Sequence, residues 1–348
     1  MKFSLKTRTK TNTDFLISKT QIQQAERTAK YYWNKMPEKI QLLVANEFHP
    51  ETIQKLDEKF QTHHLWKLPP DEKIKLIQEL QGECDAIATA SWMVDEIIYE
   101  LDSLKIISCF GVGVDGVNFE LTRSRNIRVS NTPDVLNDAV ADIAIALVLA
   151  TTRNIVNADR FVREKKWLQG PFPFGMGLAE KTLGIVGCGR IGEEIASRAL
   201  TFGLKIAYHN RSPKDLPYSY HSSIADLAEA SDILLCMLPG GEGTRNAIDA
   251  DIFNKLGPSG IFINVGRGSS VDEIALASAL QKQHIFAAGL DVYADEPNVP
   301  EELLKQDNIV LLPHIGSATV ETRRAMGQLV IDNLDAYFSG KPLITEVS

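Results

Sequence analysis

Cysteine is scarce in this sequence. Its 348 residues contain four cysteines, and these are scattered without the spacing of a metal-ligand set. Isolated cysteines argue against a disulfide framework and are typical of buried residues in a reducing compartment. We therefore expect a cytoplasmic protein without a metal site. The cysteines are Cys84, Cys109, Cys188 and Cys236.

Long hydrophobic runs are also missing. The longest run, Ile143 to Ala150, is bounded by Asp142 and Arg153. A membrane helix needs about 20 consecutive apolar residues. The run therefore predicts a buried helix, and we expect no membrane partner.

The sequence lacks the excess of positive charge that nucleic-acid-binding proteins usually carry. It has 37 Lys and Arg against 45 Asp and Glu, a formal net charge of −8, so we expect no nucleic-acid partner. Residues 1–35 differ, because they hold eight basic residues against only Asp14 and Glu26. They lack the apolar core of a secretory signal. We interpret them as a disordered basic extension, with a transit peptide as the alternative.

From Lys39 onward, short apolar strands alternate with amphipathic helices. Such alternation is typical of βαβ units, in which helices cover a parallel sheet. We expect an α/β fold with two Rossmann-like or flavodoxin-like parallel-sheet domains, the second inserted into the first. The first domain is expected at 36–135 and 320–348, and the second at 136–319. Strands are predicted at 40–46, 62–68, 84–90, 104–111, 127–133, 183–187, 205–209, 232–236, 260–265, 286–290 and 309–312, and helices at 50–60, 70–80, about 94–101, about 137–155 and 319–340.

A glycine-rich loop follows the first strand of the inserted domain. Gly187, Gly189 and Gly192 have the G-x-G-x-x-G spacing between a predicted strand and a predicted helix. In this arrangement the first glycine permits a tight turn and the second lets the backbone approach a pyrophosphate. The third lets the helix pack closely on the strand. The loop predicts dinucleotide binding, and a plain structural turn is the alternative.

The acidic residue that often binds the ribose hydroxyls of NAD is missing after the next strand. Asn210 lies near that position, and Arg211 and Ser212 follow it. An acid there would repel a 2′-phosphate, whereas Arg can bind one through paired charged hydrogen bonds. The turn predicts a preference for NADPH, with NAD possible. The alternative is a solvated basic turn, since Asp215 is close enough to alter the local charge.

Three further segments are expected at the carboxyl ends of strands, where open α/β sheets bind ligands. They contribute Arg267, Glu296 and His314. Reduction of a 2-keto acid needs a cation for the carboxylate and an acid that protonates the new alkoxide. Histidine with a carboxylate partner suits the second task. Taken alone, each residue has a simpler explanation, as a surface ion pair, a solvated loop acid or a helix cap.

The segments "GCGRIG", "NVGRGSSVDE", "LDVYADEP" and "LLPHIGSAT" together resemble the D-2-hydroxyacid dehydrogenase family over about residues 37–345. The resemblance implies that Arg267 binds the substrate carboxylate and carbonyl. It also implies that His314 is the general acid/base paired with Glu296, and that Asp291 holds the nicotinamide carboxamide. "CFGVGVDGVNF" (109–119) resembles the family's substrate loop, in which the N–H groups of Val112 and Gly113 bind the carboxylate.

The resemblance also implies a set of cofactor contacts. The segment "LPGGEGTRNAI" (238–248) resembles a cofactor-lining loop, but Gly240 and Gly241 depart from the usual C-P-L-T-P-E-T-R pattern. The expected cofactor-binding residues are Gly187, Gly189, Arg190, Ile191, Gly192, Asn210, Arg211, Ser212, Leu238, Pro239, Thr244, Val265, Gly266, Asp291, His314 and Gly316.

Within the family, the turn at 210–214 and the last helix look most like NADPH-dependent glyoxylate, hydroxypyruvate and hydroxyphenylpyruvate reductases. We expect reduction of a small 2-keto acid to a D-2-hydroxy acid by a homodimer, with residues 143–150 and 167–175 suited to the interface or to packing within the chain. Asn46, Glu47 and Phe48 are candidates for the substrate pocket wall. One alternative is a non-catalytic dinucleotide-sensing protein of the co-repressor kind. Another is an NAD-linked dehydrogenase with a different substrate.

Overall fold

The computed structural model describes residues 39–90 and 94–347, so the predicted extension at 1–35 lies outside the described residues. The described chain forms two parallel-sheet α/β domains, called here the sheet-A domain and the sheet-B domain. Both belong to one compact unit, residues 41–348. The predicted fold class is confirmed, whereas the exact domain boundaries stay a prediction.

Sheet B has the strand order β12-β11-β10-β9-β6-β7-β8, and all its neighbouring strands are parallel. The order reverses at β6, which lies between β9 and β7, and ligands of open α/β sheets bind beside such a switch point. The strands are β6 (Thr182–Val186), β7 (Lys205–His209), β8 (Ser219–Tyr220), β9 (Ile233–Cys236), β10 (Ile261–Asn264), β11 (Ala287–Leu290) and β12 (Ile309–Leu311).

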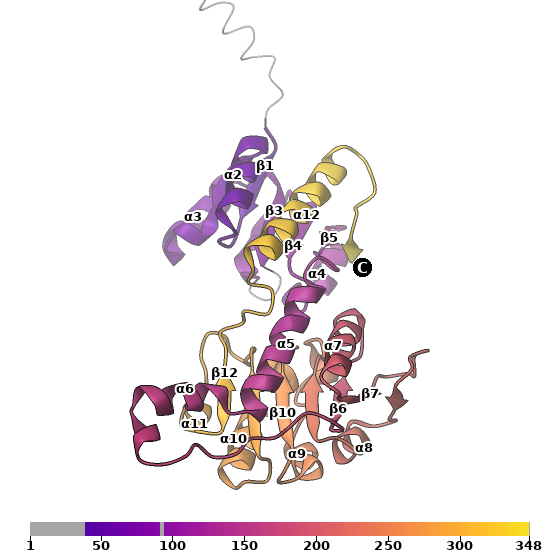
Figure 1. Cartoon of the computed structure of the whole chain (residues 1–348). Helices are drawn as coiled ribbons and strands as arrows, with labels where there is room; N and C mark the ends of the chain where they lie inside the picture. The colour runs from indigo at the N-terminus through magenta and orange to yellow at the C-terminus, as the bar shows by residue number, and fades with distance from the viewer. Residues whose placement is uncertain (1–38, 91–93, 348) are drawn as a thin grey trace, which may run out of the picture. The chain divides into compact units, whose positions relative to one another are not determined.

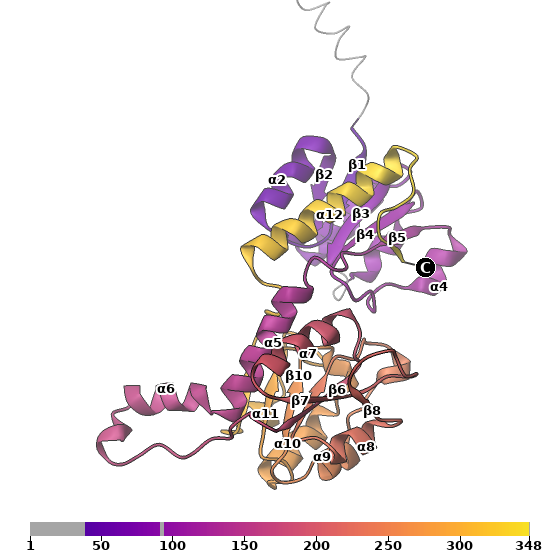
Figure 2. The same ribbon diagram turned by 45° about the vertical axis from the view of Figure 1, so that its right-hand side comes forward.

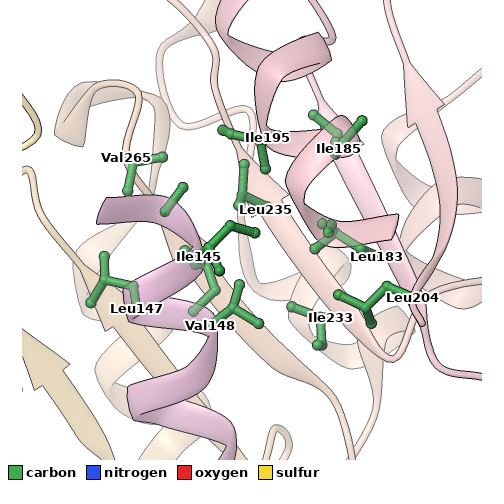
Figure 3. Packing of buried hydrophobic residues seen from close by; sticks show 14 of the residues in the cluster. Ile145, Leu147, Val148, Leu183, Ile185, Ile195, Leu204, Ile233, Leu235 and Val265 are labelled. Carbon is green, nitrogen blue, oxygen red and sulfur yellow. The ribbon is translucent and has the colours of Figure 1, made fainter. Parts of the chain in front are cut away.

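Sheet B is buried by helices that come from the same stretch of chain. Helix α5 supplies Ile145, Leu147 and Val148 to a core that also contains Leu183 and Leu235 (Figure 3). The long apolar run of the sequence is therefore largely intrachain core. The helices are α5 (Asn137–Thr152), α6 (Ile155–Arg163), α7 (Arg190–Thr201), α8 (Ile224–Glu229), α9 (Ala250–Leu256), α10 (Glu273–Gln281) and α11 (Glu301–Leu304).

Sheet A has the order β13-β5-β4-β3-β1-β2. Its strands are parallel except β13, which pairs antiparallel with β5. The strands are β1 (Gln41–Val44), β2 (Gln61–His64), β3 (Cys84–Ala90), β4 (Ile106–Phe110), β5 (Arg128–Ser130) and β13 (Glu346–Val347), and the helices are α2 (Pro50–Lys59), α3 (Pro70–Glu79), α4 (Phe119–Ser124) and α12 (Val320–Phe338).

Insertion of the sheet-B domain is visible in the path of the chain. After β5 the chain enters α5 and builds sheet B, and after β12 it returns through α12 to the sheet-A domain (Figure 1). Helix α12 packs against β4 and α2. Thr319 caps its first turn by accepting a hydrogen bond from the N–H of Thr322 at 3.1 Å.

Most predicted strands are confirmed, but three predictions about local structure were wrong. The helix expected at 137–155 ends at Thr152, because Asn154 takes a left-handed conformation (φ 52°) before α6 begins. The strand expected at 62–68 ends at His64 and continues as a short 3₁₀ turn. The helix expected at about 94–101 is a 3₁₀ helix, Glu96–Glu100. The short strands β8 and β13 were missed.

Across the described residues, no single helix is long and apolar enough to cross a membrane. Helices α5 and α6 pass the same length and composition test only as a pair, and a bend of 59° separates them.

Candidate active site

The glycine loop lies between β6 and α7, as expected. Gly187 has φ 92°, and a Cβ at this position would lie 2.9 Å from the carbonyl oxygen of Met237. A Cβ at Gly192 would lie 3.1 Å from the carbonyl oxygen of Gly187, so the helix packs closely on the loop. A Cβ at Gly189 would meet no atom within 4 Å. The open space at Gly189, at the N-terminus of α7, fits the pyrophosphate of a dinucleotide.

The turn after β7 is folded by hydrogen bonds to its backbone. The amide nitrogen Nδ2 of Asn210 donates to the carbonyl oxygen of Cys188 at 3.1 Å, so this side chain ties β7 to the glycine loop. A carboxylate could not donate this bond. The hydroxyl of Tyr208 bonds to the backbone of Lys214, and the Lys214 ammonium forms an ion pair with Glu193 at 2.9 Å.

Arg211 and Ser212 are exposed at the tip of this turn. The Arg211 guanidinium has no hydrogen-bond or ion-pair partner among residues 39–90 and 94–347. Arg190, the first residue of α7, instead forms an ion pair with the exposed Asp134 at 2.9 Å. The structure therefore leaves the Arg211 cation available to an anionic ligand, whereas Arg190 is engaged.

Many of the predicted site residues surround one cavity of about 180 Å³. Its wall combines the end of β4 with the loops that follow β9, β10, β11 and β12. Gly111, Leu136, Val140, Met237, Ser317 and Met326 also line it and were not predicted. The predicted residues in the wall are Val112, Gly113, Ile191, Leu238, Pro239, Val265, Gly266, Arg267, Asp291, His314 and Gly316.

His314 and Glu296 are paired in the structure. Nδ1 of His314 lies 2.7 Å from Oε2 of Glu296, and Oε1 of Glu296 accepts the N–H of Tyr293 at 3.0 Å. Burial alone would raise the pKa of Glu296, but the hydrogen bond and charge of His314, with help from the Tyr293 N–H, outweigh it and lower that pKa. Glu296 therefore remains an ionised partner of the imidazole at neutral pH. His314 has φ 52°, an uncommon conformation for a non-glycine residue.

Asp291 supports the backbone turn that carries His314. Its carboxylate oxygens accept the N–H groups of Ile315 and Gly316, each at 2.8 Å, and its carbonyl accepts the N–H of His314 at 2.9 Å. Burial raises the pKa of Asp291, and the two N–H donors partly offset that effect. The structure thus gives Asp291 a role in the site that sequence reasoning missed. Its predicted contact with the nicotinamide stays a prediction.

The loop after β4 contributes Val112 and Gly113 to the cavity wall. Gly111 exchanges hydrogen bonds with Thr132, and the carbonyl of Val112 accepts the Asn131 amide at 2.8 Å. These bonds fix the loop in place. The N–H groups of Val112 and Gly113 donate to no described residue, so they are available for an anion.

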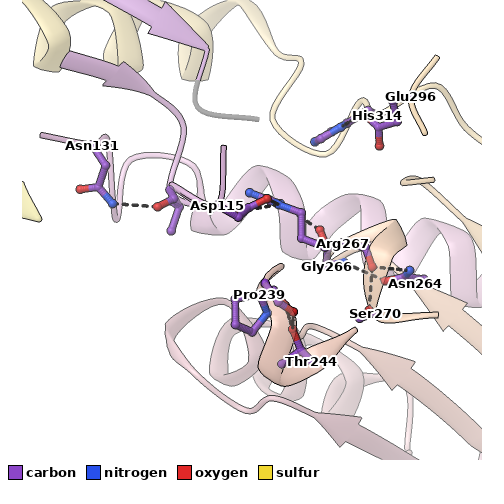
Figure 4. Close-up of polar contacts among 12 residues, drawn as sticks. Asp115, Asn131, Pro239, Thr244, Asn264, Gly266, Arg267, Ser270, Glu296 and His314 are labelled. Atoms are coloured by element: carbon purple, nitrogen blue, oxygen red, sulfur yellow. Dashed lines mark hydrogen bonds and ion pairs between the residues drawn. The ribbon is translucent and has the colours of Figure 1, made fainter. Parts of the chain in front are cut away.

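Arg267 lies against this loop. Its Nε donates to both carboxylate oxygens of Asp115, at 3.1 and 3.2 Å, and its Nη1 donates to the carbonyl of Gly266 at 2.9 Å (Figure 4). A Cβ at Gly113 would collide with Nη2. Asp115 is a site residue that sequence reasoning missed. The only signal was its place in the glycine-rich segment "GVGVDGV", 152 residues from its partner.

Thr244 and Asn46, two further residues proposed from the sequence, make their contacts outside this cavity. The hydroxyl of Thr244 donates within its own turn, to the carbonyl oxygens of Pro239 at 2.7 Å and Gly241 at 3.1 Å (Figure 4). Asn46 accepts hydrogen bonds from Thr89 and from the Ala90 N–H, so it supports the end of β3.

The other two residues proposed for the pocket wall lie elsewhere. Glu47 and Phe48 line a separate cavity of about 470 Å³. The ring of Phe48 stacks on the ring of Phe110, with 4.9 Å between the ring centroids. Phe110 immediately precedes the Gly111–Gly113 loop, so this second cavity lies beside the strand β4 that leads into that loop. Within the described residues, no group of three or more His, Cys, Asp or Glu is arranged to hold a metal ion.

The chain is similar to several characterised enzymes. It is 44% identical to the glyoxylate/hydroxypyruvate reductase A HPR2 of Arabidopsis thaliana over 84% of this chain and 94% of the relative. It is 43% identical to a hydroxyphenylpyruvate reductase of Plectranthus scutellarioides with the same two coverages. Among solved structures, an NADPH-dependent glyoxylate/hydroxypyruvate reductase from Sinorhizobium meliloti, in complex with NADP and malonate, shares 42% identity and a TM-score of 0.81, and the match covers 89% of this chain and 97% of that one.

A family model agrees with these relatives. The D-isomer specific 2-hydroxyacid dehydrogenase, NAD binding domain, matches residues 145–316, which hold the glycine loop, Arg267 and His314. The family expected from the sequence motifs is confirmed. The chain belongs to the D-isomer specific 2-hydroxyacid dehydrogenases and is an oxidoreductase that uses a nicotinamide dinucleotide.

Proposed function

We propose that this protein uses NADPH to reduce small 2-keto acids, namely glyoxylate to its achiral 2-hydroxy acid and hydroxypyruvate to a D-2-hydroxy acid. The main support is that Arg267, His314 and the backbone of Val112 and Gly113 border the same cavity of about 180 Å³. The names of the relatives agree with this substrate class.

Substrate binding is assigned to the loop after β4 and to Arg267. The N–H groups of Val112 and Gly113 and the Nη2 edge of the guanidinium bind the carboxylate, and Arg267 also polarises the ketone oxygen. Fixed donors of this kind stabilise developing negative charge without reorganising during the reaction.

Proton transfer is assigned to His314. When bound, the nicotinamide cofactor supplies the hydride that adds to the carbonyl carbon next to the substrate carboxylate. The carbonyl electron pair moves to the oxygen, which takes a proton from Nε2 of His314 and leaves a neutral imidazole. Glu296 holds Nδ1 at 2.7 Å, so its carboxylate orients the ring and stabilises the imidazolium before transfer.

Substitution of His314 or Arg267 tests these roles. We expect His314→Ala and Arg267→Ala each to lower kcat/KM for glyoxylate by about 100-fold or more, since a general acid contributes on that order. NADPH binding, measured by fluorescence titration, should change little. Turnover like that of the unaltered enzyme in either variant would contradict the assigned role.

The preference for NADPH is assigned to Asn210, Arg211 and Ser212. Arg211 is exposed at the end of β7 and has no partner among the described residues. Its guanidinium can bind a 2′-phosphate through two parallel hydrogen bonds. A neighbouring acid would repel that phosphate, and here the amide of Asn210 takes the place of the acid.

Arg211→Ala tests the cofactor assignment. We expect the KM for NADPH to rise about 10-fold or more, with little change for NADH, because a charge-assisted bidentate contact contributes about 1.5–3 kcal/mol. Arg128→Ala, which removes an exposed arginine paired with Glu346 in the sheet-A domain, is the matched control. Equal losses for both cofactors would show that the turn at 210–214 is an ordinary basic surface.

The physiological substrate is identified by rates with a panel of keto acids. Initial rates with NADPH against glyoxylate, hydroxypyruvate, pyruvate and 4-hydroxyphenylpyruvate should be highest for the first two. If NADPH is bound but not consumed with any of them, the protein is instead a dinucleotide-sensing binding protein.

A homodimer is also part of the proposal. Helix α6 and the chain after it extend away from sheet B (Figure 2). They carry apolar side chains that are largely exposed, including Trp167 at 67% and Leu168 at 87%. Exposed apolar surface of this kind marks protein–protein contact sites. Helix α5, by contrast, is largely buried within its own chain and offers little of its apolar surface to a partner.

A further inference from the structure

Asp115 is held against Arg267 in a partly enclosed setting. The two side chains are 22% and 21% exposed, respectively, and Nε of Arg267 reaches both carboxylate oxygens. The surroundings screen this pair less than water screens a surface ion pair. Asp115 is therefore a partner that can fix the orientation of the guanidinium.

The N–H donors of the Arg267 guanidinium are divided between two acceptors in the protein and the cavity. Nε bonds to Asp115 and Nη1 bonds to the carbonyl of Gly266. Nη2 lies against Gly113, where a Cβ would collide with it. A guanidinium has five N–H donors in one plane, so bonds at Nε and Nη1 fix that plane and direct Nη2 towards the substrate loop.

The loop after β9 makes room for this carboxylate. A Cβ at Gly240 would lie 2.8 Å from Oδ2 of Asp115 and 3.0 Å from its Cγ. Gly240 is also one of the positions at which this loop departs from the C-P-L-T-P-E-T-R pattern. The departure thus coincides with the contact that Asp115 needs, since a larger residue there would push the carboxylate towards Arg267 or out of place.

We propose that Asp115 is a positioning residue, which holds the Nε edge of Arg267 so that Nη2 faces the keto-acid carboxylate at the Gly111–Gly113 loop, and that Gly240 leaves the space for it. This inference rests on the substrate-binding role proposed for Arg267. Asp115 and the substrate use different edges of one guanidinium, so they do not compete for the same hydrogens.

Two variants separate the effect of the negative charge of Asp115 from its effect on the orientation of the Arg267 guanidinium. Asp115→Asn keeps an oxygen acceptor for Nε but removes a negative charge beside an anion site. Asp115→Ala removes both the acceptor and the charge, so the guanidinium loses one of its two anchors. Orientation predicts a large difference between the variants, whereas charge alone predicts that they behave alike.

The experiment measures kcat and KM for glyoxylate, KM for NADPH, and the inhibition constant of oxalate, a dianion that cannot be reduced. For Asp115→Ala we expect the glyoxylate KM and the oxalate constant to rise about 10- to 100-fold, because small misplacements of a binding group can cost up to about 100-fold. For Asp115→Asn both constants should stay within about threefold of the original or fall, because a neutral group no longer opposes the anion. The NADPH KM should change little in either.

Gly240→Ala tests the same idea while leaving the ion pair chemically intact. It should raise the glyoxylate KM in the same direction as Asp115→Ala, by about 3- to 10-fold, since overpacking displaces neighbouring groups. Glu229→Ala, which removes an exposed carboxylate from Lys255 in the sheet-B domain, is the matched control and should not alter either constant. Because Gly240→Ala and Asp115→Asn are small changes, the inference stays testable even if Asp115→Ala does not fold.

The outcomes separate this inference from the proposed function. An unchanged glyoxylate KM in Asp115→Ala, or equal losses in Asp115→Asn and Asp115→Ala, overturns the positioning role while Arg267→Ala remains impaired. An unchanged glyoxylate KM in Arg267→Ala overturns the proposed role of Arg267 and the inference with it. In the Arg267→Ala background, Asp115→Ala should add little further loss, since both changes act through one guanidinium.

Discussion

Individual residues in the site act mainly through the backbone segments that they fix. The Asp291 carboxylate accepts backbone N–H groups of the turn that carries His314. The Asn210 amide donates to the glycine loop. Glu273 accepts the N–H of Ala294 at 2.8 Å, in the segment that leads to Glu296. Each is a polar side chain whose partner lies in a different loop. Sequence motifs pointed to the candidate catalytic residues, but these supporting bonds depend on loops that meet only after folding.

Glu273 makes the stability of the folded protein depend on pH. Burial raises the pKa of Glu273, and nearby Glu296 and Asp295 add to this, although the Ala294 N–H opposes it. Because the pKa of Glu273 is higher in the folded protein than its ordinary value of 4.5, folding favours the neutral carboxyl. The stability that this group contributes is therefore fully present below pH 4.5 and is lost as the pH rises through the folded-state pKa. Glu273→Gln keeps an acceptor without the charge, so we expect its Tm at pH 7 to exceed that of the original by about 1–3 °C.

Measuring the Tm of Glu273→Gln and of the original protein at a second pH checks whether the charge on Glu273 lowers stability. At pH 4 the difference in Tm between Glu273→Gln and the original should nearly vanish, because both side chains are then largely neutral in the folded protein. Glu120→Gln, at an exposed position of α4, serves as control and should show no comparable gain at pH 7. A lower Tm for Glu273→Gln at pH 7 would contradict the argument.

Among the helices, α12 depends on a glycine to approach its neighbour. Gly327 is buried, and a Cβ there would collide with the hydroxyl of Thr52 in α2 and lie 2.7 Å from its Cγ2. Close approach of two helices explains why glycine, a poor helix former, occurs in the middle of a 19-residue helix. The sequence predicted the helix, but the reason for its glycine lies in α2, far away along the chain.

Gly327→Ala tests this helix contact. The gain in helix propensity of about 1 kcal/mol should be outweighed by overpacking, which costs about 1–3 kcal/mol. We therefore expect a lower free energy of unfolding in urea titrations. In the Thr52→Ala background the same substitution should be neutral or stabilising, because the colliding atoms are gone. The same loss in both backgrounds would exclude Thr52 as the cause.

The proposed homodimer can be tested at the exposed apolar segment after α6. Replacing Trp167 and Leu168 together by Glu should halve the particle mass measured by light scattering, since charge at the centre of an apolar contact opposes association. The circular dichroism of the variant should be unchanged, because both side chains are largely exposed in the single chain. A variant with the original mass would show that this segment does not form the interface.

The sequence by itself determined the α/β class, the order of most strands, the glycine loop and the family. These features depend on local periodicity and on short motifs, which can be identified before the chain folds. It did not determine the break at Asn154 or the antiparallel strand β13. Asn154 takes a left-handed conformation that few sequence signals mark, and β13 is a two-residue strand whose partner, β5, lies more than 200 residues away.

Only the tertiary structure decided how the site is supported. The motifs identified Arg267, Glu296 and His314, but the pairing of Arg267 with Asp115 and the fit of Gly240 beside it join three loops from distant parts of the chain. Such contacts depend on where parallel strands end in two different sheets. No periodicity or spacing records that geometry, because it is set by the packing of whole elements.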